Sequence, residues 1–244
     1  MAAANNAAIL TGVAATAFLG PFTQTVYTPS LPELQEFFQV NTVMVNLTIS
    51  LFTAILAVSN FIVGPAADVW GRRAVLLPGL AVFCLGSLLC LLATPYPLFL
   101  AGRAVQAIGI STALLVAPTV IGDIYAPAER AQAMSAYQTV TFLGPVFGPV
   151  IGGLIAAYLR WQWAFALLVA AAVAVWAYNL RFLKETKPHS VTPVKITAQT
   201  FHGVLANRSA LSIVVIGFSQ LKACSHPGTG DRQRWRSVAP GLLA

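Results

Sequence analysis

The sequence predicts an all-α membrane protein in which six helices cross the bilayer. Of its 244 residues, 57% are hydrophobic and only 9% are charged, whereas soluble domains carry roughly 25% charged residues. No charge occurs between Glu36 and Asp68 or between Arg73 and Arg103. Such uncharged segments match the ~20 apolar residues that a helix needs to cross a hydrocarbon core about 30 Å thick. So few charges could not cover the surface of a soluble fold of this size, which excludes that class.

Six apolar segments are long enough to span, and short breaks separate them. An acidic loop at 28–41, a charged turn at 64–73 and a Pro-containing break at 94–97 follow the first three. A polar loop at 123–130 and an aromatic turn at 160–163 separate the rest. In order, the predicted spanning helices are residues 7–27, 42–67, 74–93, 98–122, 131–159 and 164–180.

The rest of the chain breaks this pattern. We divide the sequence into a transmembrane bundle at 1–183, a cytoplasmic linker at 184–208, a partial helix at 209–221 and an aberrant, disordered tail at 222–244. The apolar segment at 209–221 would reach about 20 Å as a helix, which is too short to cross. The tail is rich in arginine, and an arginine near mid-bilayer costs roughly 2.5–3.5 kcal/mol. We therefore expect no seventh crossing.

The basic residues predict the orientation. With the 64–73 turn inside, the outer loops hold only Arg160. The inner loops hold eight basic residues: Arg72, Arg73, Arg130, Arg181, Lys184, Lys187, Lys195 and Arg208. Cytoplasmic loops carry the excess of Lys and Arg, so we expect a cytoplasmic N-terminus. The net charge of +7 is scattered through these short loops, which indicates the lipid bilayer rather than nucleic acid as the partner.

Nothing in the sequence indicates enzymatic or metal chemistry. The three cysteines, Cys84, Cys90 and Cys224, form no CxxC pair, and no Cys/His pattern of a metal site occurs. The three histidines lie in polar segments. We therefore predict no catalytic residues, no metal and no cofactor.

The first motif is the turn that contains Gly64, Asp68, Gly71, Arg72 and Arg73. Its glycines permit tight turning. Asp68 can pair with Arg72 or cap a neighbouring helix, and both arginines can reach helix C-terminal carbonyls or lipid phosphates. The alternative is an ordinary positive-inside loop.

The second motif is Arg103, with Gln106 and Gly109 after it in the same apolar segment. A membrane-embedded arginine costs several kcal/mol unless it is paired or hydrated, so it is a functional candidate. Gln106 lies one turn further on the same face. The alternative is an arginine near a helix end that extends to the interface.

The third motif is a glycine and proline series in the fifth segment. Gly144, Gly148 and Gly152 recur every fourth residue and form one smooth stripe, beside Pro149 and Gly153. Membrane helices approach one another closely along such stripes. The alternative is a packing helix without further meaning. The tetrapeptide Phe-Leu-Gly-Pro occurs at 18–21 and again at 142–145, and we interpret this recurrence as coincidence.

These segments resemble motifs A, B and C of the major facilitator superfamily. Motif A usually has a basic residue where this chain has Val69, and motif B has a glycine where it has Ala107. With Tyr-Thr-Pro-Ser-Leu-Pro at 27–32, the chain resembles the fungal drug:proton antiporter-1 group, near its quinidine-resistance-type members. The resemblance covers about residues 7–188. It implies the six-helix N-terminal half of a twelve-helix transporter, followed by part of its seventh helix.

The resemblance also implies a function. The family exports small amphipathic molecules in exchange for protons, so we expect a plasma-membrane transporter with a small-molecule substrate. Four polar residues would line the cavity beside Arg103 and Gln106: Gln24, Thr25, Asn46 and Asn60. No carboxylate lies within the six spanning segments, which leaves the proton carrier unassigned.

A six-helix half would need a partner. We expect the Gly144–Gly148–Gly152 stripe to pack on a helix of the missing C-terminal half, or on a second copy of the chain in a homodimer. Two alternatives stay open. The chain is a truncated, non-functional fragment of such a transporter, or, more distantly, a six-helix membrane receptor or scaffold.

Overall fold

The computed structural model of the chain describes residues 2–186, which are helical apart from short connections. Six of the helices are long and apolar enough to cross a membrane, as the sequence predicts. The elements are α1 (Ala2–Val26), the 3-10 turn η1 (Thr28–Ser30), α2 (Leu31–Phe38), α3 (Thr42–Trp70), α4 (Arg72–Leu91), α5 (Tyr96–Ile124), α6 (Pro127–Tyr158) and α7 (Gln162–Phe182).

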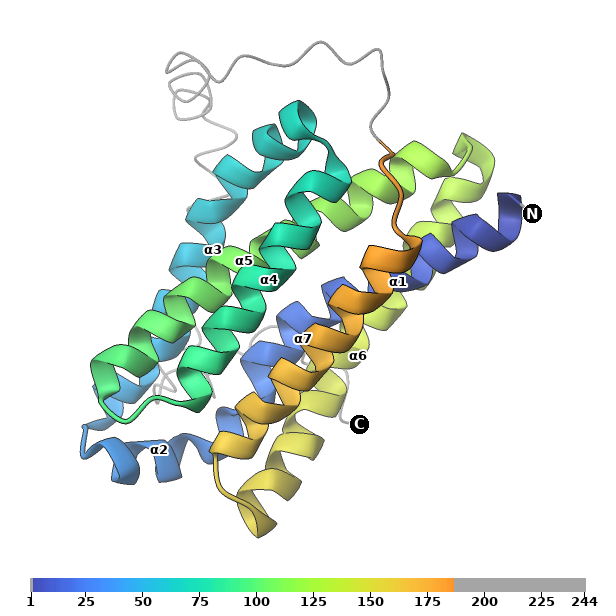
Figure 1. Ribbon diagram of the computed structural model, residues 1–244. Helices are drawn as coiled ribbons and strands as arrows, with labels where there is room; N and C mark the ends of the chain where they lie inside the picture. Colours follow the sequence, from blue (N-terminus) through green and yellow to red (C-terminus); the bar gives the residue numbers. More distant parts are fainter. Residues whose placement is uncertain (1, 187–244) are drawn as a thin grey trace, which may run out of the picture. The chain divides into compact units, whose positions relative to one another are not determined.

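The six long helices lie side by side in one bundle (Figure 1). α5 packs most extensively against α4 and also contacts α3 and α1. α1 packs along α6, and α4 packs along α7. α1 and α5 are the most buried spans, and α3 and α6 are the most exposed.

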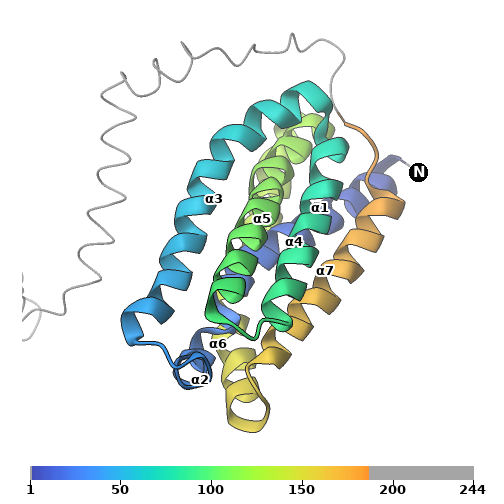
Figure 2. The same cartoon turned by 60° about the vertical axis from the view of Figure 1, so that its left-hand side comes forward.

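The predicted loop at 28–41 is wrong in part, because most of it is helical. α2 lies across one end of the bundle, which both views show (Figures 1 and 2). Its rings hold it there: Phe38 contacts Phe99 of α5 and Trp161 at 5.3 and 5.6 Å between ring centroids. Glu33 accepts a hydrogen bond from the Trp161 backbone N–H at 2.9 Å. The amphipathic helix α2 therefore caps this end of the bundle, which we call the Trp161 end.

Two other predicted breaks are much shorter than expected. α3 continues through the charged motif to Trp70, so that only Gly71 separates it from α4. α5 extends to Ile124 and α6 begins at Pro127, which leaves two residues of the predicted 123–130 loop outside a helix. Polar and charged residues at the end of a spanning segment can still be helical. Charge alone therefore does not mark where a helix ends.

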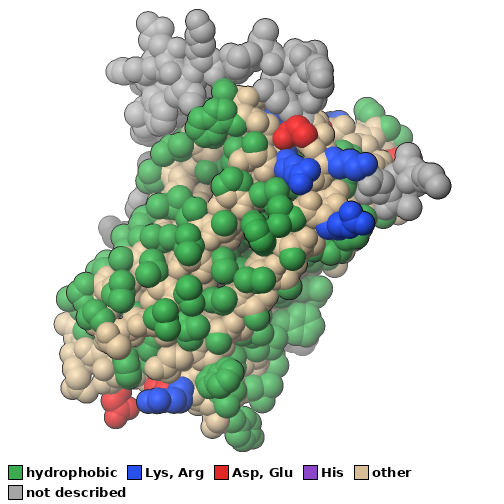
Figure 3. All heavy atoms as spheres, viewed as in Figure 1, with side chains coloured by type: hydrophobic (Ala, Val, Ile, Leu, Met, Phe, Trp, Pro, Cys, Tyr) green, Lys and Arg blue, Asp and Glu red, His purple; other side chains and the backbone are tan. Residues whose placement is uncertain are grey.

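Charged side chains gather at the two ends of the bundle, and hydrophobic side chains cover the length between them (Figure 3). The basic residues at the end opposite α2, which we call the Arg72 end, are Arg72, Arg73, Arg130, Arg181 and Lys184. Arg160 lies at the Trp161 end. The predicted segments from residue 187 onward, namely most of the linker, the partial helix at 209–221 and the tail at 222–244, lie outside the described residues.

Candidate functional site

Arg103 lies in the interior of the bundle. It is the eighth residue of α5, and its side chain is fully buried. Its Nη1 donates to Gln106 Oε1 at 2.6 Å, Gln106 Nε2 donates to Ser87 Oγ at 2.7 Å, and Ser87 Oγ donates to the Phe83 carbonyl at 2.9 Å. This chain of hydrogen bonds joins α5 to α4. The bundle encloses the arginine side chain, which does not extend to the surface of the bundle as the snorkelling alternative requires.

Two glycines allow this network to form. A Cβ on Gly109 would lie 2.6 Å from the Phe83 Cα, and one on Gly86 would lie 2.7 Å from the Gln106 Cα. Real side chains do not approach so closely, so both positions require glycine for α4 and α5 to touch backbone to backbone. The motif glycine Gly109 therefore brings Ser87 within reach of Gln106.

Two aromatic rings contact the Arg103 guanidinium. Its Cζ lies 4.4 Å from the Tyr27 ring centroid and 4.3 Å from that of Phe52. Desolvated cation–π contacts are worth about 2 kcal/mol or more each, which is comparable with the ~2.5–3.5 kcal/mol that an arginine costs at the centre of a membrane helix. Arg103 Nε and Nη2 have no hydrogen-bond partner among residues 2–186. The groups that contact the charge are thus neutral, and two of its three nitrogens make no hydrogen bond within residues 2–186.

The motif at the Arg72 end forms a compact charge cluster. Arg72 is 5% exposed. It pairs with Asp68, which lies in the last turn of α3 across the Gly71 break, and with Asp123 at the end of α5, at 3.0 Å each. It also donates to the Ala67 carbonyl at 2.9 Å. The predicted pairing with Asp68 and the predicted contact with a helix C-terminal carbonyl are both present in the structure. Asp123 was not among the predicted site residues.

Glu185 joins the end of α7 to this cluster. Its carboxylate accepts from the backbone N–H groups of Arg72 and Arg73 at 2.9 and 3.2 Å. These are the first, otherwise unpaired amides of α4, where a negative charge is favoured. Arg73 donates from Nη2 to the Leu180 carbonyl of α7 at 3.1 Å. Gly71 has φ +101°, a conformation that favours glycine, and no side chain then separates the turn from Glu185.

A small pocket opens near this end between α1 and α6. Its lining residues are Leu10, Tyr125, Glu129, Gln132, Ala133 and Ala136. Burial raises the pKa of the Tyr125 hydroxyl above its ordinary value, and the Glu129 carboxylate raises it further. Tyr125 therefore stays a hydrogen-bond donor at neutral pH.

The glycine stripe of α6 packs inside the bundle, which corrects the prediction that it packs on another half. Cβ atoms on Gly144, Gly148 and Gly152 would meet α1 and the residues after it: Phe18, Pro21, Phe22, Thr25, Val26 and Pro29. Gly153 has no atom of another residue in reach of a Cβ, and Pro149 is exposed, so neither belongs to this contact. The two Phe-Leu-Gly-Pro segments thus meet, since Gly144 approaches Phe18 and Pro21.

The four predicted cavity residues are placed differently from one another. Thr25 donates to the Pro21 carbonyl at 3.0 Å and lies under the glycine stripe, so its hydroxyl is engaged in helix packing. Gln24 is half-buried and Asn46 is exposed. Asn60 is half-buried, and its Oδ1 is enclosed without a partner in the described part of the chain. No hydrogen bond within residues 2–186 joins these four side chains.

Asn179 is a buried polar residue that the sequence reasoning missed. Its Nδ2 donates to Thr16 Oγ1 at 3.0 Å and lies 3.3 Å from the Gly12 carbonyl, so it ties α7 to α1. The signal was a single amide within the apolar segment 164–180. An isolated polar residue in a spanning helix is most often satisfied by a neighbouring helix.

Comparison with known proteins gives a consistent result. The family model described as "Major Facilitator Superfamily" matches residues 13–228, and therefore continues beyond residue 188, where we expected the resemblance to end. Multidrug resistance protein MdtL of Escherichia coli O127:H6 is 32% identical over 191 residues, which is 78% of this chain and 49% of that protein. MdtL of Citrobacter koseri is 31% identical over the same length.

Solved structures share the fold. The peptide transporter POT in complex with sulfate has a TM-score of 0.67 at 16% identity and covers 85% of this chain and 45% of its own. The human organic anion transporter MFSD10 has a TM-score of 0.62 at 21% identity, with 75% and 49% covered. The chain thus spans about half the length of the curated relatives and of the structures that it matches.

Proposed function

The chain belongs to the major facilitator superfamily, a family of membrane transporters rather than enzymes, and from this premise we propose that it forms one half of a proton-coupled exporter of small amphipathic molecules. Its relationship to MdtL, named as a multidrug resistance protein, supports that substrate class. Its motif segments support a place beside the fungal drug:proton antiporter-1 group.

The buried Arg103 network carries this proposal. Ionisable residues inside a membrane bundle are expensive and mark substrate or ion pathways. Every Asp and Glu in residues 2–186 lies near a helix end or in α2, so Arg103 is the charged group deepest within the described bundle. We assign it to the coupling of proton and substrate movement, together with Gln106.

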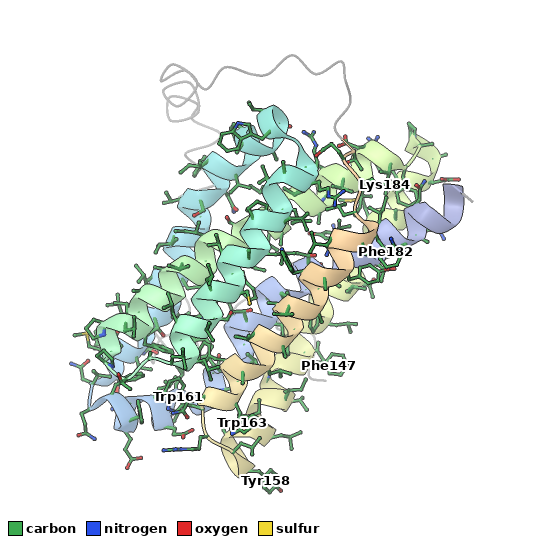
Figure 4. The ribbon with its side chains drawn as sticks, in the orientation of Figure 1. Phe147, Tyr158, Trp161, Trp163, Phe182 and Lys184 are labelled. Atoms are coloured by element: carbon green, nitrogen blue, oxygen red, sulfur yellow. The ribbon has the colours of Figure 1, made fainter. Side chains whose placement is uncertain are left out.

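The working transporter requires a second half. Substrates of such transporters pass between two helical units that rock about a site at the bilayer midplane. This chain supplies one wall of that path. Large apolar residues of α6, including Phe147 and Tyr158, point away from the bundle (Figure 4), and Val58 and Ile62 of α3 are exposed as well.

A complementation experiment tests the function. The chain is co-expressed with the C-terminal half of E. coli MdtL, and efflux of ethidium from energised cells is measured with and without a protonophore. We expect protonophore-sensitive efflux from the pair and none from either half. The same efflux from the purified chain alone in liposomes with a proton gradient would contradict the need for a second half.

The second candidate is a fragment without transport function, which the half-length coverage of the relatives favours. In that case no partner half restores efflux, although the chain inserts and folds. Inactivity with the C-terminal halves of both MdtL and a fungal antiporter, each shown to reach the membrane, would support this candidate over the first.

The orientation has its own test. We place the Arg72 end in the cytoplasm of a plasma-membrane protein, because five basic residues of the described chain lie there against one at the other end. Cysteines replace the exposed residues Arg160 or Lys184 in a background whose native cysteines are alanine. An impermeant maleimide added outside should label Arg160→Cys and miss Lys184→Cys, and the reverse pattern would overturn the orientation.

A further inference from the structure

The hydrogen bonds of Arg103 do not explain how its positive charge is stabilised inside the bundle. A guanidinium stays protonated in proteins, so this buried side chain carries a full positive charge. Its polar partner among residues 2–186 is the neutral Gln106 amide, and two of its nitrogens have no partner there. The rings of Tyr27 and Phe52 also lie close to its Cζ, at 4.4 and 4.3 Å from their centroids.

Both rings are also enclosed by other parts of the bundle. Tyr27 directly follows α1, is fully buried, packs 5.9 Å from the Phe165 ring of α7 and shares a hydrogen bond of 3.3 Å with Thr48. Phe52 lies in the middle of α3 and is also fully buried. The rings therefore come from the connection that follows α1 and from α3, and both α1 and α3 pack against α5.

We propose that Tyr27 and Phe52 are positioning residues that hold the Arg103 guanidinium through its attraction to the ring faces, in the place where a carboxylate would otherwise stand. The negative face of an aromatic ring attracts a cation without accepting a hydrogen bond. The rings thereby hold Arg103 by its charged guanidinium group, while Nε and Nη2 keep their hydrogen-bonding capacity. A carboxylate would have consumed those donors in a bidentate pair.

This arrangement has a mechanical consequence. Because one ring belongs to the α1 connection and the other to α3, any movement of either helix relative to α5 changes the environment of the charge. The rings thus link the position of α1 and α3 to the environment of the Arg103 guanidinium. This step rests on the proposed function, whereas the ring contact itself does not.

Fluorination of Phe52 distinguishes an electrostatic contact from simple packing. Fluorine atoms withdraw electron density from the ring face and change its shape little. Mono-, di- and trifluorinated phenylalanine are incorporated at position 52 of the purified full-length chain, and its melting temperature in detergent is measured. We expect the melting temperature to fall stepwise with each fluorine, and we expect no such steps in an Arg103→Met background.

Phe83 provides the matched control. It is fully buried in the same bundle, on α4, and contributes a backbone carbonyl rather than a ring face to the Arg103 network. The same series at position 83 should give no stepwise fall. Steps that persist without Arg103, or that are equal at positions 52 and 83, would overturn the proposal.

A spectroscopic measurement completes the test. In the chain with isotope-labelled arginine, the Arg103 Nε–H proton is identified by its loss in Arg103→Met. Ring currents of Tyr27 and Phe52 should shift the resonance of this proton away from the chemical shift of the exposed arginines. Phe52→Leu should move the resonance back toward that chemical shift. A resonance unchanged by Phe52→Leu and by Tyr27→Leu would also overturn the proposal. Neither measurement uses transport, so failure of the efflux experiment leaves both results interpretable.

Discussion

The two buried arginines of the bundle are stabilised in opposite ways. Arg72 sits at one end and is surrounded by acceptors: two carboxylates, a carbonyl and, through its backbone, Glu185. Arg103 sits deep in α5 with one amide and two rings. Both are almost fully enclosed, at 5% and 0% exposure. Burial alone therefore says little about role, and the chemistry of the partners says more.

Under the proposed function, the difference separates a structural charge, Arg72, from a functional one, Arg103. A cation whose partners satisfy it fully contributes to stability and is damaging to remove. A buried cation with few polar partners is costly to keep in a membrane bundle, which makes it a candidate for a functional role. Arg72 joins the turn, α5 and the end of α7 into one unit. Arg103 can change partners without breaking that unit.

The sharpest test of this comparison is the loss of transport in Arg103→Met. Methionine keeps much of the side-chain volume and removes the charge. In the chain paired with the MdtL C-terminal half, we expect protonophore-sensitive ethidium efflux to fall about 100-fold, which corresponds to ~2.7 kcal/mol on the rate scale. The free energy of unfolding of the purified chain should change by less than about 1 kcal/mol, because apolar replacements of buried ionic groups are often neutral.

Efflux at the level of the unmodified chain would remove Arg103 from the coupling mechanism. A loss of efflux accompanied by an equally large loss of stability would make it a structural residue like Arg72. Gln106→Leu serves as the companion variant, since it removes the hydrogen-bond partner and leaves the cation in place.

Arg72→Met should show the opposite pattern. It leaves Asp68 and Asp123 without their cation, and charged hydrogen bonds of this kind are worth roughly 1.5–3 kcal/mol. Since Asp68 is 40% exposed, we expect the lower part of that range, about 2 kcal/mol. The free energy of unfolding is measured by SDS titration with tryptophan fluorescence. Arg73→Met, which loses one exposed hydrogen bond, is the control and should change it by no more than ~0.5 kcal/mol.

The sequence was sufficient for the spans and for local pairs. Composition and spacing predicted six crossings, and they predicted that Gln106 would share a helix face with Arg103. These two residues are three positions apart, so helix geometry alone brings them together. The pairing of Asp68 with Arg72 was predicted from their closeness in sequence, and the two residues lie on α3 and α4, on either side of Gly71. The polar residues at the Arg72 end were likewise predicted to lie together by their charge.

Contacts between distant segments could not be predicted in the same way. Asp123 and Glu185 reach Arg72 from 51 and 113 residues away, and nothing local in either segment indicates that partner. The glycine stripe predicts a smooth face but does not say which helix lies on it, and that helix is α1. α2 was missed because eight residues that begin with Leu-Pro resemble a loop in an otherwise apolar chain. The contacts of Tyr27 and Phe52 with Arg103 could not be predicted either, because both rings are far from Arg103 in the sequence.

The motif glycines Gly71 and Gly64 differ in backbone conformation and in the space around them. Gly71 has φ +101° and ψ 157°, which is essentially restricted to glycine, and a Cβ there would lie 2.5–2.9 Å from the Glu185 carboxyl group. Gly71→Ala should therefore lower the free energy of unfolding by about 1–2 kcal/mol. Gly64→Ala, in helical α3 with open space around it, should raise it by about 0.5 kcal/mol or leave it unchanged. If both alanines have the same effect in the SDS titration, the strained turn is not what holds Glu185.

Salt should act on one arginine and not on the other. The Debye length falls from about 10 Å at 0.1 M to about 3 Å at 1 M salt, so salt weakens the pairs of Arg72, whose partners Asp68 and Asp123 are 40% and 15% exposed. We expect the penalty of Arg72→Met to shrink by a few tenths of a kcal/mol between these concentrations, the usual size of an exposed ion-pair effect.

The fluorination steps at Phe52 should stay the same, because Arg103 is fully enclosed. Comparing each variant with the unmodified chain at the same salt removes the effect of salt on the detergent. A salt-sensitive Phe52 series would mean that water and ions reach Arg103, and the contrast between the two arginines would then be one of degree.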